Sequence, residues 1–195
     1  LKDRIDSQIL THYPKSIEDG IKITQSQSWI RRHHDKEVVI PYYMKEIIET
    51  AAHEARASEF VEQKSGVSAR MTISAMENLV SNAERRSILN GEKIIFPRIT
   101  DLNAVLPGMT GKIELVFEGE QEGPVKVSKA LIGRSVREVF RKYFPDPLVK
   151  KQKRHLPAGT GSEQNQPASE PYTEIVKWFE GGNYIELTDE MTFKE

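Results

Sequence analysis

The 195-residue sequence contains no cysteine and no long hydrophobic run. Without cysteine, the chain cannot form a disulfide scaffold, a thiolate metal site or a cysteine nucleophile. The lack of cysteine suits a reducing compartment, so we expect a cytoplasmic protein. No apolar run approaches the about 20 residues that a membrane-spanning helix needs, and we expect no membrane association.

An excess of charge of one sign is also missing, since 28 lysine and arginine residues stand against 29 aspartate and glutamate residues. No overall field therefore draws the chain to nucleic acid or to an anionic membrane, and we expect neither as a partner. Hydrophobic residues make up 37% of the sequence, which is enough for a core. The length allows one domain or one and a half.

What the sequence does contain is helical periodicity. Apolar residues recur three and four positions apart in several long segments, which predicts a mainly α fold, a helical bundle with a few short strands. Serine before a segment, and glycine or proline behind it, mark the predicted ends. The first predicted helix begins at about Ile17 after a Ser16 cap, and the second begins at Pro41 and carries the apolar stripe Tyr43, Ile47, Ile48, Ala51, Ala52 and Ala55. The next predicted helix runs from a Ser68 cap to about Leu89 and is followed by Gly91. Two more are predicted from about Ile99 to Pro107-Gly108 and along Ile132 to Tyr143.

Strands, turns and one shorter helix are predicted between and beyond these segments. They are a strand over 5–11, a solvated charged turn over 31–36, a strand followed by an acidic turn over 112–123, a short amphipathic helix over 172–179, a turn at 181–183 and a strand over 184–187.

Composition predicts how the chain is organised. Residues 148–170 combine a basic run with Gly, Ser, Gln, Asn and Pro, and they cannot bury enough apolar surface to offset their chain entropy. We therefore expect a helical domain over 15–147, a flexible linker over 148–170 and a small, incomplete α/β appendage over 171–195. Both ends fall inside structured-looking segments, so we expect the chain to be part of a larger polypeptide.

The most informative segment is Gly66-Val67-Ser68-Ala69-Arg70, directly before a long predicted helix. An arginine in the first turn of a helix lies at the positive end of the helix dipole, where an anion would compensate for the unfavourable cation. A guanidinium suits phosphate because its planar fork makes two parallel charged hydrogen bonds. The residues alone leave two interpretations open: an anion-binding Arg70, and a surface arginine in solvent, which is the commoner case.

Several further motifs follow this segment in order. Together with Ala75, Ala83, Glu84-Arg85-Arg86 and Asn90-Gly91-Glu92, it resembles the helical lid of AAA+ ATPases of the magnesium-chelatase and MoxR-type branch. Phe96-Pro97-Arg98-Ile99-Thr100-Asp101-Leu102 resembles the start of the family's next helix, and Thr110-Gly111-Lys112-Ile113-Glu114 resembles its chelatase-like members. The opening Leu1-Lys2-Asp3-Arg4-Ile5 is similar to the family's Leu-x-Asp-Arg-Phe, with Ile5 in place of the aromatic residue. The resemblance covers about residues 1–145.

The resemblance implies roles for two arginines. Arg70 would be the sensor 2 arginine, which reaches the γ-phosphate of ATP in its own subunit, and Arg4 would be an arginine finger toward the ATP of a neighbouring subunit. Positioned arginines stabilise the charge that develops in phosphoryl transfer. Residues 1–14 would then end the α/β core of the ATPase, and the full-length protein would form a homo-oligomeric ring, expected to be a hexamer, that binds ATP and Mg²⁺.

The sequence lacks the parts of such an enzyme that bind and hydrolyse ATP. It has no Gly-x-x-x-x-Gly-Lys-Ser/Thr phosphate loop and no apolar strand ending in Asp-Glu. The segment Gly108-Met109-Thr110-Gly111-Lys112-Ile113 is only superficially similar, because its glycines are too close together and no Ser or Thr follows the lysine; it is predicted to be a turn. We therefore expect the chain by itself to sense nucleotide without hydrolysing it.

The remaining candidates are scattered histidines, a polar helix face, an acidic run and a basic run. For each of them a structural interpretation is favoured. We expect no zinc site at His12, His33-His34 and His53, and a water-exposed helix side at Glu46, Glu49, His53 and Glu54. Residues 118–122 are predicted to be a solvated turn rather than a calcium site, and residues 150–155 a solubilising tether rather than a nucleic-acid contact.

The leading hypothesis is the C-terminal lid region of a ring-forming, chelatase-like AAA+ ATPase, which couples ATP hydrolysis to the remodelling of a protein partner or to metal insertion into it. The rival hypothesis is a helical adaptor or regulatory protein-interaction module that binds no nucleotide.

Overall fold

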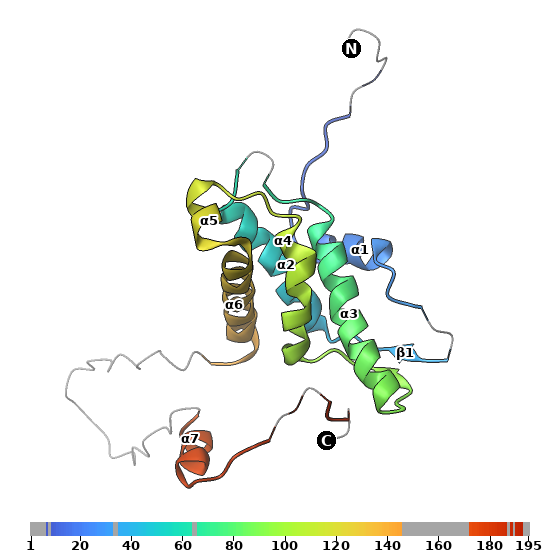
Figure 1. Cartoon of the computed structure of the whole chain (residues 1–195), viewed down its shortest axis with the longest axis vertical. Coiled ribbons are helices and arrows are strands. Elements are labelled where there is room, and N and C mark those ends of the chain that lie inside the picture. The colour runs from blue at the N-terminus through green and yellow to red at the C-terminus, as the bar shows by residue number, and fades with distance from the viewer. Residues whose placement is uncertain are drawn as a thin grey trace, which may run out of the picture. The chain divides into compact units, whose positions relative to one another are not determined.

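The structure, a computed structural model, describes residues 7, 9–32, 35–63, 66–145, 172–186, 188 and 190–192. The chain divides into two compact units, one formed by Leu1–Val139 with Asp189–Glu195 and the other by Phe140–Thr188. The predicted mainly α fold is confirmed, and the described residues form only two short strands. The elements are α1 (Ile17–Gln27), β1 (Glu37–Val38), α2 (Tyr42–Ala57), α3 (Met71–Leu89), β2 (Ile94–Ile95), the 3-10 helix η2 (Ile99–Val105), α4 (Leu106–Thr110), α5 (Phe117–Glu122), α6 (Pro124–Tyr143) and α7 (Thr173–Glu180) (Figure 1).

Local sequence signals explain several helix ends. Ser16 precedes α1, and its Oγ accepts a hydrogen bond from the backbone N of Asp19 at 3.1 Å, so the predicted cap is confirmed. Pro41 is the cap residue of α2, one position before its first turn. Behind α3, Gly91 adopts a φ of 65°, a left-handed conformation that glycine tolerates best and that commonly ends helices.

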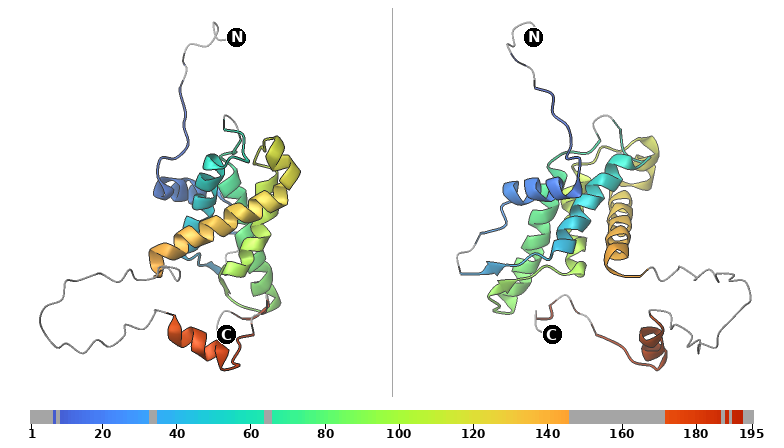
Figure 2. Two further views of the ribbon diagram at one scale, coloured as in Figure 1. Left: turned by 90° about the vertical axis from the view of Figure 1, so that its left-hand side faces the viewer. Right: turned by 180° about the vertical axis from the view of Figure 1, so that it is seen from behind.

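The core of the first unit is built around α3. This helix packs against α1, α2, α4, η2 and β2, and α1 also packs against α2 (Figure 2). The main apolar cluster takes its buried members from α2, α3, η2, α4 and α6 and from the segments between them. The apolar side of α6 adds Val127, Leu131 and Val139 to the same cluster. The predicted stripe of α2 is confirmed, because Ile47, Ile48, Ala51, Ala52 and Ala55 are buried, while Tyr43, its first member, is partly buried.

A short parallel pairing closes one end of this core. Glu37 lies opposite Ile94, and Val38 lies opposite Ile95. Ile95 is buried with Val80 and Ala83 of α3 in a second, smaller cluster. The strands therefore attach the segment before α2 to the C-terminal half of α3.

The predicted end of the third helix at Pro107-Gly108 is wrong. The 3-10 helix η2 passes directly into α4, in which Pro107 occupies one of the first positions, where no amide donor is needed. Gly108 lies against α3, since an added Cβ would come within 3.1 Å of the carbonyl oxygen of Ser74. Pro107 and Gly108, which suggest a helix end when only the local pattern is considered, therefore lie inside a helical segment, and Gly108 allows α4 to pack closely against α3.

The strand and acidic turn predicted over 112–123 are also wrong, because Ile113 and Leu115 make only isolated bridges and Phe117–Glu122 form the helix α5. The backbone N of Val116 donates to the carbonyl of Phe60 at 3.1 Å. Gly119 approaches the same residue so closely that an added Cβ would lie 2.4 Å from the oxygen of Phe60. A contact between distant segments therefore accompanies the helix, and no local pattern predicts it.

The strands predicted near the two ends are absent from the described residues 9–14 and 184–186. Ile9 and Leu10 are almost fully exposed, so their apolar side chains have no face to pack on. The short helix predicted over 172–179 is confirmed as α7, and Gly182, with a φ of 82°, lies in the predicted turn behind it. The predicted linker over 148–170 lies outside the described residues.

Candidate functional site

The turn that precedes α3 carries the arginine that the sequence singled out. The backbone N of Ser68 donates to the carbonyl of Lys112 at 2.9 Å, and that of Glu114 donates to the carbonyl of Gly66 at 2.7 Å. The predicted cap position is wrong by two residues, because Arg70 is the cap residue and Ser68 Oγ accepts from the backbone N of Arg70 at 3.2 Å. The backbone that leads to Arg70 is therefore held at several points.

Arg70 itself is exposed, and within the part of the chain that the structure describes its guanidinium makes no hydrogen bond or ion pair. It lies at the N-terminus of a 19-residue helix, where free amide donors and the helix dipole favour an anion. The guanidinium and the helix end could therefore act on one anion together. The predicted arginine finger, Arg4, lies outside the described residues.

Gly66 has a structural reason of its own to be glycine. Its backbone N donates to the carbonyl of Glu62 at 2.8 Å. An added Cβ would lie 2.0 Å from the same oxygen, which is too close for any side chain. The glycine of the Gly-x-x-x-Arg motif is thus required by the turn, whatever Arg70 binds.

Tyr13, which the sequence analysis did not single out, connects the segment before α1 to the turn before α3. Its hydroxyl donates to the carbonyl of Val67 at 2.5 Å. Arg56 Cζ lies 4.2 Å from the centre of the Tyr13 ring. Arg56 Nε is buried without a hydrogen-bond partner among the described residues, so the ring face supplies a favourable contact to this cation. No local signal predicts these contacts, because the three residues come from distant segments.

A buried carboxyl links three helices near the start of α3. Glu49 of α2 is only 2% exposed, and its Oε1 accepts a hydrogen bond from Thr24 Oγ1 of α1. Thr24 Oγ1 lies 2.7 Å from Thr72 Oγ1 of α3. Burial raises the pKa of Glu49, and hydrogen bonds from the two threonines and the charge of Arg56 oppose part of that rise.

This arrangement shows that the predicted water-exposed side of α2 is wrong. Glu46 and Glu49 are buried, while His53 and Glu54 are partly exposed. α1 covers this side of α2, and Gly20 allows the approach, since an added Cβ would lie 2.4 Å from Glu49 Oε2. Two carboxylates on one helix side predict contact with water, and only the position of α1 makes that side an interior.

Because of Glu49, we expect the free energy of unfolding to fall as the pH rises. The folded chain raises the pKa of Glu49 above its unfolded value of about 4.3, so it binds this proton more tightly than the unfolded chain does. The fall should begin near the unfolded pKa and level off above the folded pKa. Glu49→Gln keeps the shape of the side chain without the charge and should remove this part of the slope. Urea unfolding of both proteins at a series of pH values tests the prediction, and parallel curves would contradict it.

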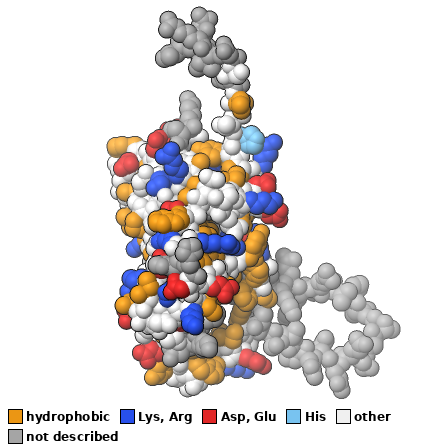
Figure 3. Space-filling view, turned by 90° about the vertical axis from the view of Figure 1, so that its right-hand side faces the viewer, with side chains coloured by type: hydrophobic (Ala, Val, Ile, Leu, Met, Phe, Trp, Pro, Cys, Tyr) orange, Lys and Arg blue, Asp and Glu red, His pale blue; other side chains and the backbone are white. Residues whose placement is uncertain are grey.

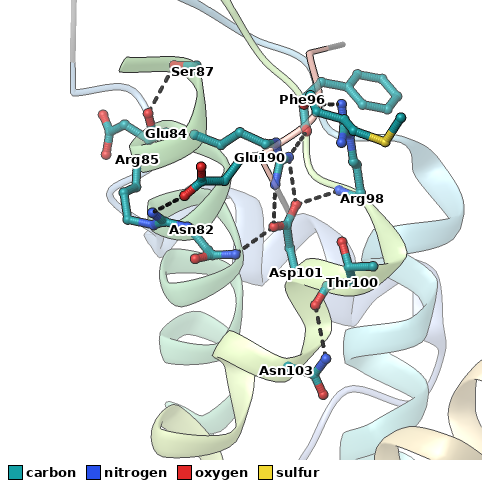
Figure 4. Close-up of polar contacts among 12 residues, drawn as sticks. Asn82, Glu84, Arg85, Ser87, Phe96, Arg98, Thr100, Asp101, Asn103 and Glu190 are labelled. Atoms are coloured by element: carbon teal, nitrogen blue, oxygen red, sulfur yellow. Dashed lines mark hydrogen bonds and ion pairs between the residues drawn. The ribbon is translucent and has the colours of Figure 1, made fainter. Parts of the chain in front are cut away.

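At the other end of α3, a buried ion pair joins two of the segments that carry the family resemblance. Arg86 and Asp101 are 3% and 1% exposed, and Arg86 contacts both carboxylate oxygens, at 2.7 and 2.9 Å. Asn82 Nδ2 and the backbone N of Arg98 each donate to this carboxylate at 2.7 Å (Figure 4). Arg86 also donates to the carbonyl of Phe96 at 2.9 Å. We call Asn82, Arg86 and Asp101 the α3 clamp. A buried charge with this many partners is well compensated.

Arg32 shows that the predicted solvated turn over 31–36 is wrong at this position. Its guanidinium donates to Ser81 Oγ at 2.7 Å and pairs with Glu84 Oε2 at 3.3 Å, and both partners belong to α3. It also lies 5.3 Å from the ring centre of Trp29. Arg32 therefore attaches the charged segment to α3, while His33 and His34 lie outside the described residues.

The other candidates form no recognisable site in the described ranges. Among those residues, no three His, Asp or Glu side chains are grouped so that they could hold a metal ion. None of the described helices is long and apolar enough to cross a membrane. On the face shown in Figure 3, cationic and anionic side chains are interspersed. The turn predicted over 108–113 is wrong for residues 108–110, which belong to α4, and the turn is found only after Thr110. The basic run over 150–155 lies outside the described residues.

A comparison with models of protein families finds no match, and comparisons with curated proteins and with solved structures find none either. The resemblance to the AAA+ lid therefore stays a prediction from the motifs of the sequence.

Proposed function

We propose that this chain is the lid region of a ring-forming, chelatase-like AAA+ ATPase, in which Arg70 senses the γ-phosphate of ATP. The observation that carries the proposal is the exposed guanidinium of Arg70 at the N-terminus of α3, which has no partner among the described residues. A guanidinium binds phosphate through two parallel charged hydrogen bonds, and the helix end adds a favourable dipole.

The backbone around Arg70 supports the proposal. Hydrogen bonds to Gly66, Ser68 and Arg70 hold the turn, so the guanidinium extends from a fixed backbone. A fixed backbone reduces the conformational entropy that the Arg70 side chain loses when it binds a phosphate. The α3 clamp adds further support, because it unites the segments 84–86 and 96–102, both of which carry the resemblance, in one structural unit.

The residues of this chain fit only one part of a nucleotide site. Arg70 suits the terminal phosphate, but the sequence has no phosphate loop and no Asp-Glu strand to hold Mg²⁺. ATP and Mg²⁺ would therefore be held mainly by other parts of a longer protein. Under the same proposal, Arg4 acts as a finger toward the neighbouring subunit of a ring, and the ring remodels a protein partner or inserts a metal into it.

In a longer protein that contains this chain, Arg70→Ala should lower the kcat of ATP hydrolysis at least about tenfold, which corresponds to about 1.4 kcal/mol of transition-state stabilisation. Arg70→Lys should recover only part of the rate, because lysine keeps the charge and loses the fork. Steady-state ATPase assays measure both effects, and far-UV circular dichroism should show an unchanged fold.

Arg137→Ala is the matched control, because Arg137 is an exposed arginine on α6, away from the turn before α3. Its ATP turnover should equal that of the wild type. Unchanged ATP turnover in Arg70→Ala would contradict the proposal and would show that Arg70 is a surface arginine without a role in hydrolysis. A sequence before Leu1 without a phosphate loop would likewise contradict the proposal.

A second candidate function is a protein-interaction module that binds no nucleotide, and α7 favours it. None of the residues of α7 is buried, and its apolar side chains are between 44% and 55% exposed: Ile175, Val176, Trp178 and Phe179. A short amphipathic helix of this kind suits insertion into an apolar groove of a partner. Under this alternative, Arg70→Ala should leave partner binding and every other activity unchanged.

A further inference from the structure

The edge of the α3 clamp contacts a segment from near the C-terminus. Arg98 Nη2 donates to the carbonyl of Met191 at 2.6 Å and also to the carbonyl of Thr192. Asn90 Nδ2 donates to the carbonyl of Glu190 at 2.7 Å. Two side chains thus bind the main-chain carbonyls of three consecutive residues.

A charged contact accompanies these hydrogen bonds. Arg85 Nη1 lies 4.0 Å from Glu190 Oε1, and Figure 4 shows both side chains beside the end of α3. Arginine and the asparagine amide offer N–H donors, which match carbonyl and carboxylate oxygens. The chemistry of this surface is therefore that of a receptor for a peptide segment with an acidic residue.

We infer that Arg85, Asn90 and Arg98 form a docking site for an acidic peptide segment, and that its resident occupant is the chain's own segment 190–192. The site recognises the occupant chiefly through its backbone carbonyls, and Arg85 adds a preference for the acidic side chain. This docking goes beyond the proposed nucleotide sensing and does not depend on it.

Contacts that do not involve the segment hold the backbone of the docking site. The backbone N of Arg98 donates to Asp101, whose carboxylate is held by the buried Arg86. Asn90 is the cap residue at the end of α3, and its backbone N donates to the carbonyl of Arg86 at 3.0 Å. Both donors therefore extend from backbone that is already ordered, which reduces the entropy lost when a segment docks.

The absence of cysteine permits a direct test. Thr188 is exposed and precedes Glu190 by two positions in the sequence, so Thr188→Cys can carry a single nitroxide spin label close to the docked segment along the chain. In the full chain the label should broaden the NMR amide signals of Asn90, Gly91 and Glu92. Arg98→Ala should abolish the broadening and keep the clamp, because Asp101 contacts the backbone of Arg98. Arg137→Ala, the matched control, should retain the broadening.

A mixing experiment identifies the occupant. In the first sample, isotope-labelled chains without cysteine are mixed with unlabelled chains that carry the nitroxide, so that only a contact between two chains broadens a signal. In the second sample, chains that carry both the isotope label and the nitroxide are diluted with unlabelled chains, so that contacts within one chain remain. Broadening that survives dilution and is absent from the mixture supports docking within one chain. Broadening in the mixture would show a second copy's segment in the site and overturn the stated occupant. No broadening at all, or broadening that persists in Arg98→Ala, would overturn the docking site itself.

Discussion

Asp101→Ala should lower the free energy of unfolding by about 3–5 kcal/mol, because it leaves a buried charge without its partner. Arg86 is 3% exposed and would lose both of its carboxylate contacts. Asn82 and the backbone N of Arg98 would lose an acceptor as well. Since domains are typically stable by only about 5–15 kcal/mol, this change would remove a large part of the total. Urea unfolding followed by far-UV circular dichroism measures the loss.

Lys22→Ala is the matched control for the clamp, because it breaks an ion pair with Asp19 whose two side chains are largely exposed. An exposed pair contributes at most about 1 kcal/mol. Arg86→Met combined with Asp101→Ala should recover part of the stability, since it removes the unpaired buried charge. Equal losses in Asp101→Ala and Lys22→Ala would contradict the role of the clamp.

Leu79→Ala should lower the free energy of unfolding by about 2–5 kcal/mol. Leu79 lies in the middle of α3, is 0% exposed and belongs to the main apolar cluster, so its truncation leaves a cavity as well as a loss of buried apolar surface. The same urea titration measures the effect.

Leu89→Ala tests whether the loss comes from burial and not from the change of helix propensity. Leu89 ends the same helix and is 61% exposed, so its truncation should change the free energy of unfolding by less than about 0.5 kcal/mol. If Leu79→Ala and Leu89→Ala lowered the free energy of unfolding by the same amount, the result would contradict the position of α3 at the centre of the core.

The sequence by itself determined the helices that carry a long apolar stripe. The spacing of Ile47, Ile48, Ala51, Ala52 and Ala55 predicted α2 and its buried side, because a helix brings residues three and four positions apart onto one face. Ser16 and Gly91 marked helix ends through local hydrogen bonding and backbone conformation. Arg70 was singled out from a helix start and a resemblance, and its exposure agrees with either interpretation that the residues left open.

Only the tertiary structure decided what the polar residues do. Glu49 looked water-exposed from its helix and is buried because α1 covers it, and the acidic segment of α5 lies against Phe60. The α3 clamp and the contact between Tyr13 and Val67 join residues from separate segments. The local spacing of apolar residues predicts which side of a helix is buried. The partner of a buried charge, however, depends on which distant segment packs against the helix. The sequence therefore determined the helices that carry a long apolar stripe but not α5 or the passage of η2 into α4, and packing between distant segments decided the polar contacts that hold the helices together.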